Sequence, residues 1–354
     1  MWKPLRGLVG ALIISVAVVA CGGSSGNGGG TLKIKMIGQG SAVLPEWRLV
    51  EAPFIADINK SNGRITIDDT PWDQTGLDQN REITILRSGQ ADIMMGTLSK
   101  ASGDIPLLEG ADLAGLNPTG QNALKAINAI GQVGAAEMAK VGVKLISSFP
   151  GPAQVIYCKQ ALQGLKDLKG RRVRTFGNSL NDFVTAAGGQ SVSIAQADVY
   201  SAMSTGVIDC AITGTSSGNA LKWYEVAHYL YTLPLSWSSD AYFVNVQWWN
   251  SLSSDNRAFL QQMLLDLAQK VTELELQLTK DGINCNTAQG TCQYGTVAKP
   301  AMIEVKPSSA DQDQVKQLLS STIIPKWVSR CGSTCGDQFN KAISPIDGVS
   351  YQKP

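Results

Sequence analysis

The chain has 354 residues and a formal net charge of +1, and 17% of its residues are charged. Its basic residues form no cluster with aromatic residues between them, which argues against a nucleic-acid-binding protein. A hydrophobic fraction of 44% at this length supports two hydrophobic cores rather than one, so we expect two lobes.

The N-terminal segment has the pattern of a lipoprotein signal peptide, which we assign to residues 1–20. Lys3 and Arg6 precede an apolar stretch that ends at Ala20 and is too short to span a bilayer comfortably. Cys21 follows small residues, as in lipoprotein cleavage sites, and residues 21–30 add a Gly/Ser-rich tether. We therefore expect lipidation of Cys21 and a protein held by lipid at the periplasmic or another extracytoplasmic face of the cell membrane. The choice between inner and outer membrane stays open.

Alternating strand and helix patterns predict the first lobe. The expected order is strand 32–37, helix 46–60, strand 65–68, helix 81–88, strand 91–95, an Ala-rich helix over 124–140 and a strand over 143–147. The last of these strands leads toward the second lobe.

The stretch from residue 165 to residue 230 predicts strand, helix, short strand, helix, strand and helix, with a Ser/Gly-rich break before the last helix. Arg174 stands at the end of the first of these strands, and Asn178 begins the helix that follows. Ligands of open α/β sheets bind at the carboxyl ends of strands, and a guanidinium fork suits a carboxylate. Arg174 is therefore a candidate carboxylate anchor, the alternative being an ordinary surface charge.

The chain then returns to the first lobe and forms a long helix. A strand is expected over 241–245, Trp248 and Trp249 are expected to pack in the first lobe, and an amphipathic helix is expected over 256–281. Two crossings between alternating β and α units predict an α/β clamp with a cleft between its lobes. We place one lobe at residues 31–150 and 236–278, and the other at residues 151–235 and 279–354.

Three motifs in this order carry a resemblance to a known family: DLKGRRVR at 167–174, DVYSAMSTGVID at 198–209 and KWYEV at 222–226. The chain resembles the dicarboxylate-binding family of solute-binding proteins of tripartite ATP-independent periplasmic (TRAP) transporters, and the similarity covers roughly residues 31–280. This resemblance implies a periplasmic-binding-protein clamp with a long helix that braces both lobes. It also implies a receptor that binds a small organic acid, without a cofactor, and delivers it to TRAP membrane permease subunits. The alternative is a sensor subunit that presents the same solute to a membrane receptor.

The resemblance also indicates site residues. Arg174 matches the family's cleft arginine, which anchors a carboxylate in other members. Gln154 stands where many members have a second arginine, so we expect one bound carboxylate rather than two. Gln196 and Thr213 replace a large apolar residue and an asparagine of the family pattern.

Candidates from the first lobe and from the return crossing are fewer and less specific. They lie near strand and helix ends and comprise Gln39, Glu46, Trp47, Trp72, Glu82 and Trp237. Trp72 either walls the cleft or packs beneath it, and the run Trp-Ser-Ser-Asp at 237–240 is placed to close the site.

Enzymatic chemistry is not expected. His228 is the only histidine, and no nucleophile, metalloprotease, phosphate-loop or dinucleotide motif is present. The acid pairs Asp68/Asp69 and Glu273/Glu275 are expected to be solvated, because the members of each pair point to different sides.

The cysteines are typical of an exported protein. Their spacing predicts local disulfides for Cys285/Cys292 and for Cys331/Cys335, whereas Cys158 and Cys210 are either buried thiols or one bridge. A metal site is not expected, because the sequence has no CxxC motif and a single histidine.

Overall fold

A computed structural model describes residues 31–353 of the chain. The expected signal peptide, Cys21 and the tether lie outside the described residues. Within them, no helix has both the length and the apolar character needed to cross a membrane.

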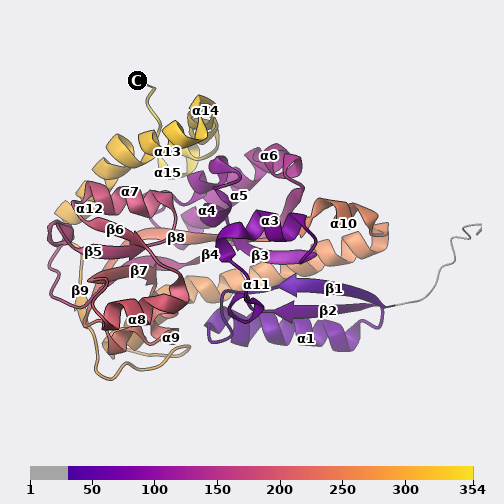
Figure 1. Ribbon diagram of the computed structural model, residues 1–354, viewed down its shortest axis with the longest axis horizontal. Coiled ribbons are helices and arrows are strands. Elements are labelled where there is room, and N and C mark those ends of the chain that lie inside the picture. The colour runs from indigo at the N-terminus through magenta and orange to yellow at the C-terminus, as the bar shows by residue number, and fades with distance from the viewer. Residues whose placement is uncertain (1–30, 354) are drawn as a thin grey trace, which may run out of the picture.

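One mixed sheet runs through the molecule (Figure 1). Its strands follow one another in the order β2-β1-β3-β8-β4-β7-β5-β6, and β9 pairs with β8. The strands are β1 Leu32–Ile37, β2 Ile65–Thr70, β3 Ile93–Thr97, β4 Val143–Cys158, β5 Arg172–Thr175, β6 Gln190–Ser193, β7 Cys210–Gly214, β8 Tyr229–Asn245 and β9 Ile303–Val305.

Helices cover both faces of this sheet (Figure 1). They are α1 Ala52–Ser61, α2 Trp72–Thr75, α3 Glu82–Arg87, α4 Leu98–Ala101, α5 Gly120–Val133, α6 Ala135–Lys140, α7 Asn178–Ala186, α8 Val199–Ser204, α9 Thr215–Ala220, α10 Val246–Ser251, α11 Ser254–Thr287, α12 Ser309–Leu318, α13 Ile324–Cys331, α14 Ser333–Ala342 and α15 Ser344–Asp347. A π-helical turn over Trp47–Glu51 precedes α1, and another over Leu319–Ile323 joins α12 to α13.

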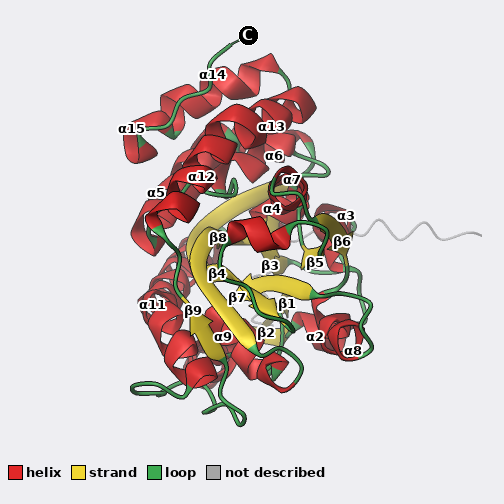
Figure 2. Ribbon diagram, turned by 90° about the vertical axis from the view of Figure 1, so that its left-hand side faces the viewer, coloured by secondary structure: helices red, strands yellow, loops and turns green. Residues whose placement is uncertain are grey.

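The sheet consists of two parallel parts joined by two long antiparallel strands. Strands β1, β2 and β3 form the first half, and β5, β6 and β7 form the second half. Strands β4 and β8 pair with each other along their length and reach both halves. Their pairing shifts register between Pro150 and Ala153, and Figure 2 shows both strands curving. Bulges of this kind bend a sheet, so the two halves meet at an angle.

Helix α11 extends behind the sheet along the whole molecule (Figure 1). Its N-terminal part buries Leu260, Leu264 and Leu267 in a core with the strands of the first half and with Trp249. Its C-terminal part packs against the second half, where the Nδ2 of Asn286 donates to the hydroxyl of Tyr157 at 2.9 Å. The expected helix that braces both lobes and the packing of Trp248 and Trp249 in the first half are therefore confirmed.

Several expected elements differ from the structure. The helix expected at the end of the 165–230 stretch is a single 3-10 turn over Trp223–Glu225, and the strand expected over 241–245 begins at Tyr229. The strand expected over 143–147 continues to Cys158, and the helix expected over 124–140 is interrupted at Gly134. The Ser/Gly-rich break after Gly214 is helix α9. Its small residues are needed for close packing, because a Cβ at Gly218 would lie 2.4 Å from the ring of Tyr157.

The C-terminal helices α12 to α15 lie beside α5 and α7 (Figure 2). Arg330 of α13 contacts Asp182 of α7 at 2.6 Å and Glu109, in the segment before α5, at 3.2 Å. Because one side chain reaches elements of both halves, the structure draws no clean lobe boundary here, and the boundaries stay a prediction.

Three disulfides form among the described cysteines. Cys158 and Cys210 lie directly opposite each other on β4 and β7 and are bonded, which decides between the two alternatives left open by the sequence. The expected local bridges Cys285–Cys292 and Cys331–Cys335 are also present.

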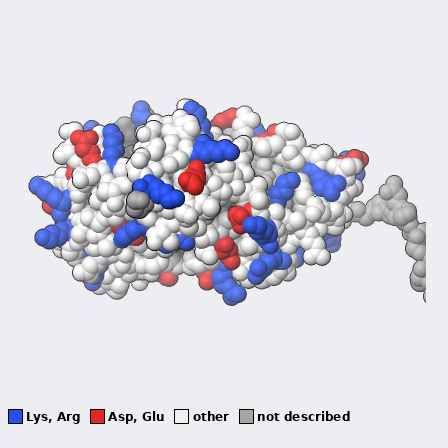
Figure 3. Space-filling model, turned by 90° about the horizontal axis from the view of Figure 1, so that it is seen from above, with Lys and Arg blue, Asp and Glu red and all other residues white. Residues whose placement is uncertain are grey.

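Charges of one sign do not gather into a large patch on the face seen in Figure 3. Lys and Arg side chains are scattered there with Asp and Glu among them. This distribution agrees with the argument against nucleic-acid binding made from composition.

Candidate functional site

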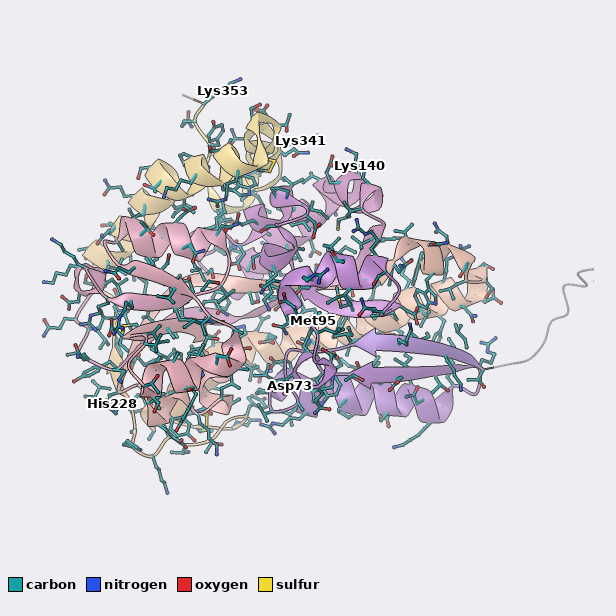
Figure 4. The ribbon with its side chains drawn as sticks, viewed as in Figure 1. Asp73, Met95, Lys140, His228, Lys341 and Lys353 are labelled. Atoms are coloured by element: carbon teal, nitrogen blue, oxygen red, sulfur yellow. A yellow bond between two sulfur atoms is a disulfide. The ribbon has the colours of Figure 1, made fainter. Side chains whose placement is uncertain are left out.

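A cavity of about 470 Å³ lies between the two halves of the sheet. Its wall is built by the segments that follow β1, β2 and β3 on one side and β5 and β6 on the other, with contributions from β4, β7, β8, α9 and α11. Carboxyl ends of parallel strands thus face each other across it, as expected for a ligand site in an α/β sheet. Met95 and Asp73, which both line the cavity, lie near the middle of the molecule in Figure 4.

The structure places most of the expected site residues in this wall. They are Gln39, Glu46, Trp72, Glu82, Gln154, Arg174, Gln196 and Thr213. The residues come from both halves and from the crossing strands, so the cavity is the cleft that the sequence predicts.

Arg174 is buried in the wall with 4% of its surface exposed. Its Nε and Nη1 donate to the carbonyls of Ile194 and Ile212, each at 2.9 Å, and its guanidinium lies 5.4 Å from the ring centre of Phe176. A guanidinium has five N–H donors, so three have no acceptor among residues 31–353. None of the ion pairs within those residues includes Arg174. Burial lowers its pKa to about 10, far above physiological pH, so a positive charge without a counterion faces the cavity.

Uncharged polar groups surround this guanidinium. Gln196 donates from Nε2 to the hydroxyl of Thr213 at 3.4 Å, and Gln154 donates to the carbonyl of Pro152 at 3.0 Å. The residues that depart from the family pattern therefore add hydrogen-bonding groups beside Arg174 and no second cation.

Trp72 forms part of the wall. Its Nε1 donates to the carbonyl of Met95 at 2.8 Å, which fixes the indole against β3. With this polar atom satisfied by the protein, the ring offers the cavity an apolar surface. Trp72 thus lines the cavity and, with 3% of its surface exposed, also packs in the hydrophobic core beneath it.

Asn178, Trp237 and Trp47 are not part of the wall. Asn178 is exposed at the start of α7, where Gly177 is the residue that faces the cavity. Trp237 points away because side chains alternate along β8, and its Nε1 donates to the carbonyl of Asn117 at 3.0 Å.

The same alternation brings Ser238 and Asp240, two residues of the run expected to close the site, into the cavity wall. Asp240 accepts a hydrogen bond from the hydroxyl of Thr97 at 2.8 Å. Burial, which outweighs its hydrogen bonds, raises its pKa to about 6. Their spacing of two residues places both side chains on the same face of β8.

Glu275 of α11 also lines the cavity and is buried. The expectation that both acids of the Glu273/Glu275 pair are solvated is therefore wrong for Glu275. Glu275 lies four residues after Val271 and three before Leu278, both fully buried, and so shares their face of the helix. Glu273 is exposed. The pair Asp68/Asp69 behaves in the same way, because both carboxylate oxygens of Asp69 are buried without a hydrogen-bond partner.

Lys100 is a second cation in the wall that the sequence did not reveal. It stands on α4, a helix of only 4 residues, and its Nζ donates to Gln79 at 2.7 Å. Burial lowers its pKa, and the charges of Glu82 and Asp240 oppose this effect. Lys100 is therefore balanced by protein acids, whereas Arg174 is not.

His228 is far from the cavity. It is exposed at the outer end of the second half (Figure 4), and its backbone N–H donates to the carbonyl of Cys158 at 2.9 Å. Its imidazole therefore cannot act together with a side chain of the cavity.

A group with metal-ligand atoms close together does occur elsewhere, at Asp281, Cys285 and Cys292. The two cysteines are bonded to each other and offer no thiolate. Asp281 accepts from the backbone N–H groups of Gln293 and Tyr294 at 2.6 and 3.0 Å. This group fastens the loop after α11.

Comparisons with known proteins agree with this geometry. Residues 51–302 match the family described as bacterial extracellular solute-binding protein, family 7. A solute-binding protein from Albidiferax ferrireducens is 26% identical over 181 residues, which are 51% of this chain and 53% of that protein. The chain thus spans about half the length of this relative.

Solved structures share the fold. An extracytoplasmic solute receptor from Bordetella pertussis that binds pyroglutamic acid is 19% identical, with a TM-score of 0.77 over 88% of this chain and 99% of that one. A sugar acid binding protein from Advenella mimigardefordensis, in complex with galactonate, is 16% identical, with a TM-score of 0.78 over 89% of this chain and 99% of that one.

These findings confirm the α/β clamp with its bracing helix and the resemblance to TRAP solute-binding proteins. They also confirm that this is a family of binding proteins rather than of catalysts. Because the match to the family covers well over half of the sequence, the chain belongs to family 7 of the bacterial extracellular solute-binding proteins.

Proposed function

We propose that the chain is an extracytoplasmic receptor that binds a small organic acid in the cavity and delivers it to the membrane permease subunits of a TRAP-type transporter. The observation that carries this proposal is the buried guanidinium of Arg174, which has free donors and no counterion among residues 31–353. A buried charge without a partner is costly, and a bound carboxylate removes that cost.

The size and surroundings of the cavity support a small ligand. Its volume of about 470 Å³ falls within the range of about 300–1,000 Å³ typical of small-molecule sites. The solved relatives bind acids of this size, pyroglutamic acid and galactonate. With Lys100 balanced by Glu82 and Asp240, Arg174 is left to hold one carboxylate.

Binding and closure are coupled in this proposal. We take residues 31–150 and 236–278 as one lobe and residues 151–235 and 279–354 as the other. A ligand that contacts Arg174 on one lobe and Trp72 on the other favours the closed arrangement, because it binds that arrangement better. A sensor subunit would use the same closed shape, and neighbouring genes for a permease or for a receptor kinase would separate the two roles.

Anchoring through a lipid on Cys21 is also part of the proposal. It rests on the basic start, the apolar stretch and the cysteine after small residues. Fractionation of cells that produce the full chain tests it: the wild type is expected with the membranes, and Cys21→Ala in the aqueous fraction. Equal distribution of the two proteins would exclude lipid anchoring.

The binding experiment is thermal unfolding of the mature protein with a panel of organic acids. A ligand at about a thousand times its dissociation constant adds about 4 kcal/mol of stability, a shift of several degrees. Arg174→Gln is expected to abolish the shift, because loss of a buried ion pair costs about 3–5 kcal/mol, or a few hundredfold or more in affinity.

Arg172→Gln is the matched control. Arg172 lies on the same strand but is partly exposed and pairs with Asp209 at 2.8 Å. This variant should keep the full ligand shift. The proposal fails if no acid stabilises a folded sample, or if the shift survives in Arg174→Gln.

A further inference from the structure

Three buried acids of the cavity wall have no role in holding a carboxylate ligand. Glu46 follows β1, Asp240 is on β8 and Glu275 is on α11, with 5%, 6% and 2% of their surfaces exposed. Negative groups in such numbers are unexpected in a site for a simple anion, since they repel it.

Two of these acids have an oxygen without any partner. Oε2 of Glu46 and Oε2 of Glu275 are buried and make no hydrogen bond within the described residues. Both residues line the cavity, so its wall contains two carboxylate oxygens that lack a donor from the protein. Buried polar atoms normally have a hydrogen-bond partner, so each of these points to a donor supplied from outside the protein.

Cations of the protein compensate the three acids only in part. None of the ion pairs among residues 31–353 includes Glu46, Asp240 or Glu275. Lys100 acts on Asp240 and Arg48 acts weakly on Glu46, but neither approaches to ion-pair distance.

The charges of the three acids act on one another. Burial, followed by the charges of Asp240 and Glu51, raises the pKa of Glu46 to about 7. Burial raises the pKa of Glu275 well above its usual value, with Glu46 and Asp240 adding to the effect. All three acids line the same cavity, so together they form one acidic region of its wall.

We propose that the ligand carries, besides the carboxylate bound by Arg174, a cationic nitrogen group that binds between Glu46, Asp240 and Glu275. The substrate class is then zwitterionic acids, such as amino acids, rather than simple carboxylates. This inference rests on the proposed function and specifies its ligand.

The position of the two charged regions fits such a ligand. Arg174 is on β5 in the second half, whereas Glu46 follows β1 in the first half and Asp240 and Glu275 are on the elements that connect the halves. A zwitterion that joins the two regions therefore holds the halves together through both of its charges.

Other ways to satisfy the acids explain less. Protonation alone leaves an O–H that also requires an acceptor. A single small metal ion needs ligand atoms close together, and within residues 31–353 the group whose ligand atoms all lie within 4.8 Å of one another is Asp281, Cys285 and Cys292. Glu46, Asp240 and Glu275 are spaced more widely, which suits an ammonium group with several N–H donors.

Ligand pairs that differ in the charged nitrogen test the inference. Calorimetric titration of the mature protein would compare alanine with propionate, 4-aminobutyrate with butyrate, and proline with pyroglutamate, whose lactam nitrogen is neutral. At least one zwitterion is expected to bind about tenfold or more tightly than its partner, a difference of about 1.4 kcal/mol.

Glu275→Gln keeps the shape of the side chain and removes its charge. This variant should lose most of that preference. Its affinity for the acid of each pair that has no charged nitrogen should be unchanged or improved. Glu273→Gln is the matched control, because Glu273 is exposed two residues away on the same helix and accepts from Gln269 at 3.0 Å. It should bind as the wild type does. Glu46→Gln provides a second variant if Glu275→Gln does not fold.

The outcomes separate this inference from the proposed function. If simple acids bind through Arg174 and the nitrogen group adds nothing in any pair, only the zwitterion inference is wrong. It is also wrong if Glu275→Gln and Glu46→Gln both leave the preference intact. If no acid of either kind binds a folded sample, the proposed function itself is wrong.

Discussion

Gly282 of α11 lies directly against the backbone of Thr215 at the start of α9. A Cβ atom at Gly282 would come within 2.4 Å of the carbonyl carbon of Thr215, a distance that real side chains do not reach. Because Gly282 has no side chain, α11 can pack directly against the start of α9 in the second half.

Gly282→Ala should consequently destabilise the protein by about 1–3 kcal/mol, because a methyl group forces α11 and α9 apart. Alanine is otherwise preferred in a helix by about 0.5–1 kcal/mol, so the loss would run against intrinsic propensity. Urea unfolding measures the difference. Gly63→Ala, at a position with no atom within 4 Å of the added carbon, should change stability by less than about 0.5 kcal/mol. Equal effects of the two substitutions would contradict this role of Gly282.

Asp69 should make the folded protein less stable as the pH rises. Burial, followed by the charges of Glu51 and Asp68, raises the pKa of Asp69 from 3.8 to about 9. Because the folded state holds this proton more tightly than the unfolded chain, its contribution is complete below about pH 4 and is lost as the pH rises toward 9. Each pH unit in this window changes the free energy of unfolding by at most about 1.4 kcal/mol per proton.

Asp69→Asn, which cannot ionise, should therefore lose less stability than the wild type between pH 5 and pH 9. Chemical unfolding at a series of pH values measures this. Asp104→Asn, at an exposed acid that is not among the charges acting on Asp69, serves as the control and should follow the wild-type profile closely. Parallel profiles for Asp69→Asn and the wild type would show that Asp69 does not hold a proton in the folded state.

The Cys158–Cys210 bridge should stabilise the protein more than the Cys331–Cys335 bridge. The first joins residues 52 apart in sequence and the second residues 4 apart. Loop-closure entropy then gives about 4 kcal/mol for the first and about 2 kcal/mol for the second. Urea unfolding of the two double Cys→Ala variants should show this order. A larger loss for Cys331→Ala/Cys335→Ala would contradict it.

Trp72 should report ligand binding through its fluorescence, because its ring is part of the cavity wall. A ligand that binds beside it changes the surroundings of the indole, and Trp72→Phe should remove most of that signal. The substitution also leaves the carbonyl of Met95 without its donor, at a cost of about 1–3 kcal/mol in stability. Trp248→Phe, in the core behind the first half, should keep the signal. Retention of the full signal by Trp72→Phe would place the ligand elsewhere.

Much of the fold could be predicted because its parallel strands have regular patterns. The alternation of β and α units located β1, β2 and β3, and the end of β5 located Arg174. Helix α9 could not be predicted in this way, because close packing against Tyr157 and α11 requires small residues that locally favour a loop.

Among the charged residues of the cavity, Glu46 and Glu82 were expected from the ends of strands and helices, whereas Glu275 and Lys100 were harder to predict. Glu275 stands on a helix rich in charged residues, where a single acid usually faces solvent. Its burial follows only from the register with Val271 and Leu278 and from the cavity that the other elements form. Lys100 depends in the same way on a turn of helix too short for a sequence pattern.

The direction of β1 has a consequence for how the protein faces a membrane. Leu32 begins the strand and Ile37 ends it, so about 20 Å of extended chain separates the point where residue 31 enters the fold from the segment that reaches the cavity (Figure 1). A lipid anchor ahead of residue 31 would hold the molecule by the end of the sheet opposite the ligand. On the proposal that Cys21 carries a lipid, the solute would enter and leave from a side of the molecule that the anchor does not cover.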